Sequence, residues 1–99
     1  MSVFKTKAEG AAVLVAPEGI IDASNAAAFQ DAVNSALPGM SQVIFDFAEL
    51  EYISSAGLRV LLATQKALGA PGAVHIRNVP SDIMEVLTVT RLAQFMIIE

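Results

Sequence analysis

A short apolar run at residues 43–47, VIFDF, lies between two segments whose apolar residues recur at helical spacing. The run is too short for an isolated helix and too continuously apolar for a strand with a solvated face. It therefore predicts a central strand that is covered on both faces. The flanking segments, residues 26–37 and 57–68, each carry an apolar stripe and predict helices. A strand between two helices indicates an α/β protein in which right-handed crossovers join parallel strands.

Further segments complete this pattern. Gly10 lies between two alternating segments and suits a short hairpin turn, and Pro17-Glu18-Gly19 ends the second of these segments. Ser81 precedes a last helical segment as a candidate N-cap. The remaining predicted strands cover residues 3–8, 12–16, 73–77 and 95–98, and the last helix covers residues 82–87. The order β-β-α-β-α-β-α-β predicts a mixed sheet of four to five strands with helices packed mainly on one face, in a single domain over residues 1–99.

The residue inventory narrows the classes of function. The net charge is −4 and the basic residues do not cluster, which disfavours binding of nucleic acid or an anionic membrane. With no cysteine and one histidine, His75, the chain offers no side-chain set typical of a metal site, and we expect no cofactor. His75 lies within a predicted strand, where a structural role is favoured over catalysis. No stretch resembles a membrane span or a signal peptide, so we expect a soluble, cytoplasmic protein without membrane insertion.

Residues 47–62, FAELEYISSAGLRVLL, are the most informative part of the chain. A predicted strand ends, an acidic and apolar connection follows, and a Ser-Ser-Ala-Gly sequence leads into the second helix. Ser54 or Ser55 can act as an N-cap whose hydroxyl accepts a hydrogen bond from a first-turn amide. The same helix start tolerates a phosphate, because free amides and the positive end of the helix dipole favour negative charge. The two serines are therefore candidates for a cap, for a modification site, or for both.

Two motifs in this chain resemble a known family. Residues 19–26, GIIDASNA, form a Gly-x-x-Asp turn after the second predicted strand, and Asp46 is followed by YISSAGLRVLL at residues 52–62. In this order the two motifs resemble bacterial anti-sigma factor antagonists of the STAS domain family. The resemblance extends over nearly the whole chain and implies a STAS-like fold.

The resemblance implies a protein switch rather than an enzyme. In that family the unphosphorylated antagonist binds an anti-sigma factor, often also a serine kinase, so that the sigma factor is released. Phosphorylation breaks this complex, and a separate serine phosphatase resets it. The implied partners are therefore an anti-sigma factor/serine kinase and a serine phosphatase.

The resemblance also assigns roles to residues. Aligning Gly57-Leu58 with the Gly-Leu pair of the family places the phosphoacceptor on Ser55. Ser54 stands where the family often has Asp and is the second candidate acceptor, while Ala56 removes a third hydroxyl. The implied partner-binding residues are Asp22, Ser24, Asn25, Ser54, Ser55, Ala56, Gly57 and Arg59.

Several of these residues have simpler interpretations. Asp22 and Asn25 suit turn and cap chemistry before the first helix. Asp46 follows an apolar strand and either hydrogen-bonds loop amides in support of the site or is an ordinary solvated acid. Arg59 is unfavourably placed for the helix dipole, so it contacts an acidic partner or a phosphate, or it is a solvated surface residue.

Two other functions compete with the phosphorylated switch. One is a STAS module that acts without phosphorylation, as a scaffold or as a subunit of a lipid-transport or signalling complex, and Ser54 in place of the usual acid favours it. The other is a small enzyme or nucleotide binder. The single histidine and the lack of a glycine-rich phosphate loop disfavour this last hypothesis.

Overall fold

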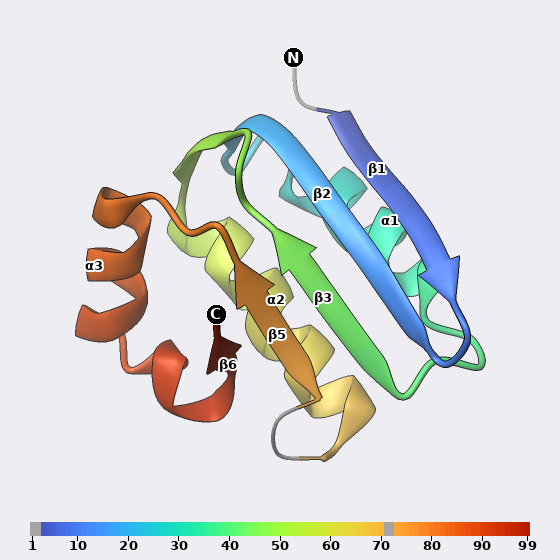
Figure 1. Cartoon of the computed structure of the whole chain (residues 1–99). Helices are drawn as coiled ribbons and strands as arrows, with labels where there is room; N and C mark the ends of the chain where they lie inside the picture. Colours follow the sequence, from blue (N-terminus) through green and yellow to red (C-terminus); the bar gives the residue numbers. More distant parts are fainter. Residues whose placement is uncertain (1–2, 71–72) are drawn as a thin grey trace.

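The structure is a computed structural model that describes residues 3–70 and 73–99. The strands are β1 (Val3–Glu9), β2 (Ala12–Ile21), β3 (Gln42–Asp46), β4 (Leu50–Ile53), β5 (Val74–Arg77) and β6 (Ile97–Ile98), and the helices are α1 (Ala26–Ala36), α2 (Ser55–Leu68), α3 (Ser81–Val89) and the 3-10 helix η1 (Leu92–Phe95). This arrangement confirms the predicted α/β class (Figure 1). Residues 1, 2, 71 and 72, which the predicted domain also includes, lie outside the described residues.

The strands form one mixed sheet in the order β1-β2-β3-β5-β6, and β4 pairs with the end of β2. β1 and β2 form the predicted antiparallel hairpin, and every other pairing is parallel. Over the described residues the sheet has six strands rather than the predicted four to five. The additional strand is β4, which occupies part of the segment predicted to be a connection.

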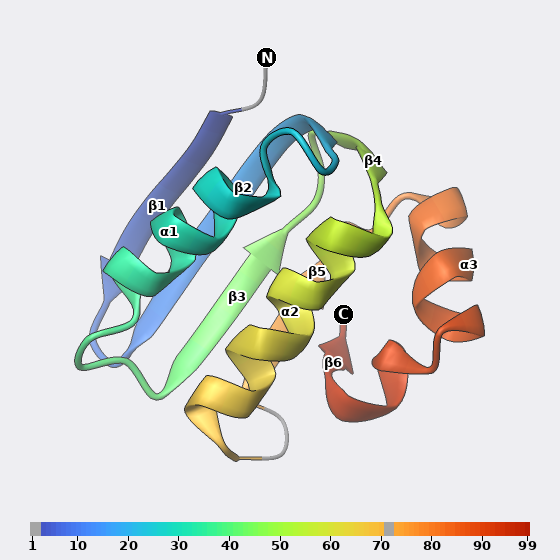
Figure 2. The ribbon, with the colours of Figure 1, turned by 180° about the vertical axis from the view of Figure 1, so that it is seen from behind.

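α1 and α2 cover one face of the sheet, as predicted, and α3 lies beyond the β5 and β6 edge (Figure 2). Alternate strand residues face these helices and are almost fully buried: Val13, Val15, Val43, Phe45, Val74 and Ile76. The ring of Phe29 on α1 lies 5.9 Å from that of Phe45 and 5.2 Å from that of Phe4. Each fully buried aliphatic or aromatic side chain stabilises the fold by roughly 1.5–3 kcal/mol, so this layer fixes both helices against the sheet.

In the part of the chain that the structure describes, the opposite face of the sheet carries no helix (Figure 1). We call it the open sheet face; Leu14, Ile44, His75 and Arg77 lie on it. Ile44 is only half-buried, so the prediction that residues 43–47 are covered on both faces is wrong. Lys7 and Arg77 line a shallow cavity with Ile44, and the aliphatic parts of such long side chains cover apolar strand residues while their charges stay in water.

β2 is longer than predicted and changes partner along its length. Residues 12–15 pair with β3, whereas residues 19–21 pair with β4, and the register shifts between Gly19 and Ile20. Gly19 has a φ of 81°, a left-handed conformation that glycine adopts without steric cost. The prediction that Pro17-Glu18-Gly19 ends the strand is therefore wrong. These residues bend the strand away from β3 instead.

The helix boundaries differ from the predicted ones by a few residues. α2 begins at Ser55 rather than Gly57, and its end at Gly69 in a left-handed conformation agrees with the prediction. The N-cap of α3 is Pro80, so Ser81 is not the cap and is instead the first helical residue. The predicted closing strand over residues 95–98 is reduced to β6, because η1 occupies the chain up to Phe95.

Candidate functional site

The bent end of β2 brings the two sequence motifs together. Ile21 and Ile53 are neighbours in the parallel pairing of β2 with β4. The backbone N–H of Ser54 donates to the carbonyl oxygen of Ile21 at 2.8 Å. The turn that follows β2 and the start of α2 are therefore adjacent, although they are far apart in the sequence (Figure 2).

Gly57 permits this close approach. A Cβ atom at this position would lie 2.6 Å from Ile53 Cγ1 and 2.8 Å from Ile21 Cγ2, which is too short for any real contact. Glycine inside a helix costs roughly 0.5–1 kcal/mol relative to alanine. The chain bears this cost because the first turn of α2 packs directly on the ends of β2 and β4.

Ser54 is the N-cap of α2. It has an extended backbone, and its Oγ accepts a long hydrogen bond of 3.4 Å from the N–H of Gly57. Its carbonyl oxygen accepts a hydrogen bond of 2.9 Å from Leu58. The side chain is half-buried. The structure thus resolves the choice left open by the sequence: Ser54 caps the helix and Ser55 does not.

Ser55 is the first residue of α2 and is exposed. Its hydroxyl forms no hydrogen bond with any other described residue. Ser55 also lies at a groove of about 250 Å³, whose other lining residues are Leu58, Arg59, Leu62, Thr90 and Leu92. An exposed, unbonded hydroxyl at the edge of a largely apolar groove is accessible to a modifying enzyme.

The turn between β2 and α1 is held by its own polar side chains. Asp22 Oδ1 accepts hydrogen bonds from the N–H and the hydroxyl of Ser24, and these bonds hold the pKa of Asp22 below its ordinary value of 3.8. Asn25 is the N-cap residue of α1, but its side chain does not cap the helix. Its Oδ1 accepts from the N–H of Asp22 at 2.9 Å, and its Nδ2 donates to the carbonyl of Ile20 at 2.7 Å. These bonds fix the turn beside the start of α2.

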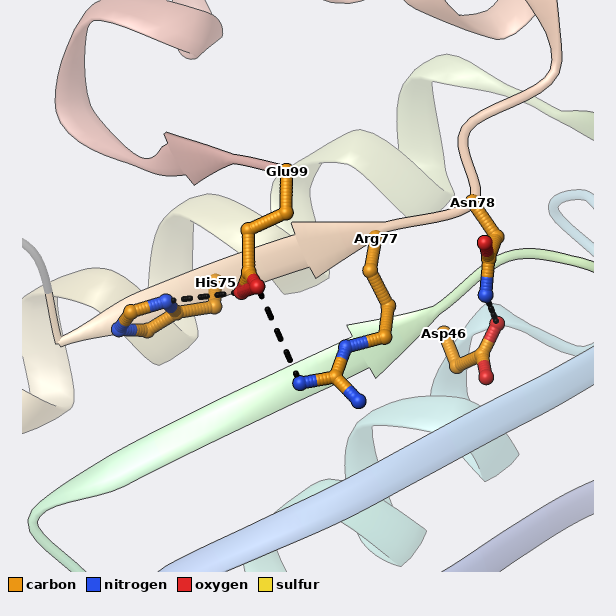
Figure 3. Close-up of polar contacts among 5 residues, drawn as sticks. All are labelled: Asp46, His75, Arg77, Asn78 and Glu99. Carbon is orange, nitrogen blue, oxygen red and sulfur yellow. Dashed lines mark hydrogen bonds and ion pairs between the residues drawn. The ribbon is translucent and has the colours of Figure 1, made fainter.

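Asp46 occupies a different position from these residues. Its Oδ1 accepts hydrogen bonds of 3.0 Å from the N–H of Ala48 and from Nδ2 of Asn78 (Figure 3). The expected bond to a loop amide is therefore present. Asp46 joins the loops after β3 and β5, and in the described residues no hydrogen bond connects it to Ser54 or Ser55.

His75 lies on the open sheet face, in the middle of β5. Its Nδ1 is 3.1 Å from Oε1 of Glu99, and Nη2 of Arg77 is 3.9 Å from the other oxygen of that carboxylate (Figure 3). His75 thus takes part in a contact between β5 and the residue after β6. This arrangement agrees with the structural role predicted for it.

Two functional candidates were missed by the sequence. Ile20 and Tyr52 are neighbours in the pairing of β2 with β4 and are 48% and 54% exposed. They lie beside the Asp22 turn and the start of α2. We call the surface formed by Ile20, Tyr52, Ser55 and Arg59, with the groove next to Ser55, the Ser55 surface. This apolar pair was not predicted, because its position depends on the unpredicted strand β4.

Among residues 3–70 and 73–99, no three acidic or histidine side chains gather as potential metal ligands. None of the helices in this described part of the chain is long and apolar enough to cross a membrane.

The fold and the position of the motifs agree with one family of domains. A family model described as "Mlab, STAS domain" matches residues 4–99. The chain belongs to the STAS domain family. No curated protein matches it significantly.

Solved STAS structures superpose closely on this chain. An anti-sigma factor antagonist from Mycobacterium paratuberculosis has a TM-score of 0.88 at 19% identity, over 99% of this chain and 85% of that one. The anti-sigma factor antagonist SpoIIAA in its unphosphorylated form has a TM-score of 0.83 at 17% identity, over 98% of this chain and 88% of that one. A chain of the Acinetobacter MlaFEDB complex in an ATP-bound conformation has a TM-score of 0.73 at 22% identity, over 87% of this chain and 93% of that one. At these identities the similarity shows the STAS fold.

Proposed function

We propose that this chain is a single STAS domain over residues 1–99 that acts as an anti-sigma factor antagonist, switched by phosphorylation of Ser55. The unphosphorylated form binds an anti-sigma factor/serine kinase through the Ser55 surface and thereby frees the sigma factor. The observation that carries this proposal is the exposed hydroxyl of Ser55, which forms no hydrogen bond with the described residues and lies at the edge of a largely apolar groove.

The geometry supports Ser55 over Ser54 as the phosphoacceptor. The hydroxyl of Ser54 is engaged with the N–H of Gly57, and its side chain is half-buried. The Ser54 hydroxyl is thus already used as the cap acceptor, whereas the hydroxyl of Ser55 is exposed to a kinase. In the proposed reaction the γ-phosphoryl group of ATP moves to Ser55 Oγ, which loses its proton, and ADP leaves.

The Ser55 surface supports binding of a protein partner. Tyrosine is among the residues that most often dominate interface energies, because it buries a large area with little loss of side-chain entropy. Tyr52, paired with Ile20 across β2 and β4 and three residues before Ser55, is such an exposed anchor. A phosphate buried against a surface that fits a neutral hydroxyl costs several kcal/mol, enough to separate the two proteins.

The remaining parts of the proposal follow from this mechanism. The chain supplies a binding surface and a phosphoacceptor and performs no catalysis itself. It acts in the cytoplasm, where the kinase has access to ATP, and a serine phosphatase removes the phosphate to restore binding. Neither a cofactor nor a metal is required.

The test begins with capture of partners from the native cell. Ser55→Ala serves as the bait that cannot be switched off, and Ser55→Asp is the matched control. We expect an anti-sigma factor/serine kinase on the first bait and little on the second. That kinase and ATP are then mixed with the wild type, Ser55→Ala and Ser54→Ala, and the phosphate is mapped by mass spectrometry. Phosphate on the wild type and on Ser54→Ala, but not on Ser55→Ala, supports the proposal; an unmodified Ser55 in the wild type contradicts it.

A second candidate function is a STAS subunit of a transport complex that acts without phosphorylation. It is favoured by the family model, which is described as "Mlab", and by the similarity to a chain of the Acinetobacter MlaFEDB complex. Ser54, where antagonists often have Asp, also favours it. Recovery of ABC transporter subunits in the capture experiment, equally on both baits, would establish this function in place of the switch.

A further inference from the structure

Among the described residues that line the groove beside Ser55, Arg59 is the only charged one. Its side chain is exposed, and within residues 3–70 and 73–99 it forms no ion pair. Because α2 begins at Ser55, Arg59 is its fifth residue and lies beyond the first turn, so the unfavourable dipole position expected from the sequence does not apply.

Ser55 and Arg59 are four residues apart in the continuous helix α2. Residues with this spacing are neighbours on one face of a helix, and both side chains line the same groove. An anion that precedes a cation by four residues forms the more favourable of the two possible orientations. A negative group on Ser55 would therefore meet the guanidinium of Arg59 without any change in the backbone.

We propose that Arg59 pairs with the phosphate of phosphorylated Ser55, and that this pair closes the groove to an acidic partner segment. Before modification, the groove offers one cation beside Leu58 and Leu62, which fits a partner segment with a carboxylate next to an apolar side chain. A phosphoserine brings a charge of about −1.5 to −2, so the net charge of the groove changes from positive to negative. The acidic partner segment then loses its contact with the Arg59 cation and meets the negative charge of the phosphate at the same place.

This inference rests on the proposed modification of Ser55, but its test does not require the kinase. Phosphoserine is incorporated at position 55 of the full-length protein during translation, and the phosphate is titrated by ³¹P NMR. We expect the midpoint in the otherwise wild-type protein to lie about 0.3 pH unit below that in Arg59→Gln, since an ion pair on a helix favours the dianion. Arg59→Lys is expected to keep most of this difference, because the charge remains.

The matched control is Lys66→Gln, which removes a cation from the last turn of the same helix. It should titrate with the wild type, and 1 M NaCl should reduce the difference between the wild type and Arg59→Gln. Coinciding wild-type and Arg59→Gln curves, or an equal shift in Lys66→Gln, would overturn the pairing. The pairing and the proposed function can fail independently. If the titration midpoints of the wild type and Arg59→Gln differ clearly but no cellular kinase modifies the protein, the switch is refuted and the pairing is confirmed.

Discussion

The Ser55 surface and the open sheet face differ in whether their polar groups have partners within the described part of the molecule. On the open sheet face and its edges the cations have partners: Lys5 lies 2.9 Å from Glu18, Lys7 lies 3.4 Å from Glu9, and Arg77 lies 3.9 Å from Glu99. On the Ser55 surface, Arg59 forms no ion pair and the hydroxyl of Ser55 no hydrogen bond with the described residues. The Ser55 surface also includes two exposed apolar side chains, Ile20 and Tyr52.

This difference supports the Ser55 surface as the proposed site of partner binding. Polar groups that pair with one another gain little from a new contact, because the existing pair must first be broken. A lone cation, an unbonded hydroxyl and an exposed tyrosine lose nothing internal when a partner covers them. The contrast between the two surfaces leads to five predictions, of which the first concerns the largest effect.

A permanent negative charge at Ser55 should greatly weaken partner binding by the Ser55 surface. We expect Ser55→Asp to weaken binding of the captured partner by about 100-fold or more, because like-charge or unpaired burial costs several kcal/mol. Ser55→Ala should bind within a few-fold of the unphosphorylated wild type. Titration calorimetry measures both variants, and equal affinities would rule out the charge mechanism.

Gly57→Ala should destabilise the base of the Ser55 surface. The added Cβ meets Ile53 and Ile21 at distances that no packed core tolerates, so these elements must separate. Overpacking of this kind typically costs about 1–3 kcal/mol, and urea unfolding with an unchanged m-value would report it. Gly10→Ala is a poorer comparison because of its positive φ, so the matched control is Ala63→Gly, which should cost only about 1 kcal/mol through helix propensity. A Gly57→Ala protein as stable as the wild type would contradict the close packing.

Tyr52→Ala should weaken partner binding with little effect on stability, as expected if the partner binds the Ser55 surface and not the open sheet face. Tyr52 is 54% exposed, so its removal costs little stability, but loss of a tyrosine anchor is expected to weaken partner binding about tenfold or more. Phe95→Ala is the control, because Phe95 is 55% exposed and lies on η1, away from β4. Surface plasmon resonance with both variants provides the measurement. A larger loss in Phe95→Ala than in Tyr52→Ala would show that Phe95, and not Tyr52, is the anchor.

The sequence predicted the elements better than it predicted this surface. The helical stripes, the hairpin and the Gly69 helix end depend on neighbours in the chain, and the structure contains them. Strand β4 was missed because it is four residues long and exposes Glu51 and Tyr52, which gives it the composition of a loop. It forms a strand only because β2 bends at Gly19 to meet it, which is a non-local event.

The sequence motifs predicted some residues of the candidate site but not the residues that other elements contribute to it. The motifs marked Asp22 and Ser55, and the structure places the Asp22 turn beside the start of α2. Ile20, Tyr52 and Thr90 were not predicted, because each reaches the Ser55 surface or its groove from an element whose place depends on tertiary packing. Periodicity also could not distinguish a strand covered on both faces from one whose open side is sheltered by long charged side chains, as at Ile44.

The Asp22 turn should make the Ser55 surface sensitive to acid. The hydrogen bonds from Ser24 lower the pKa of Asp22 from its ordinary value of 3.8, so the ionised carboxylate is stabilised by folding. This contribution is present above the ordinary pKa and is lost as the pH falls through the lowered value. We expect Asp22→Asn to show a smaller loss of stability than the wild type between pH 5 and pH 2, as measured by urea unfolding. Parallel pH profiles would show that the turn does not favour the charged form.

Glu99→Gln should have the smallest effect and tests the other half of the comparison. The Glu99 carboxylate contacts His75 and Arg77 on the open sheet face, but it is substantially exposed, and such pairs contribute about 0–1 kcal/mol. The backbone bond from the N–H of Glu99 to the carbonyl of Ile76 at 2.8 Å remains in the variant, so β6 should stay in place. We therefore expect a small loss of stability in urea and an unchanged affinity for the partner. If Glu99→Gln instead weakened binding as much as Tyr52→Ala does, the paired charges of the open sheet face would belong to the interface, and internal pairing would no longer distinguish the two surfaces.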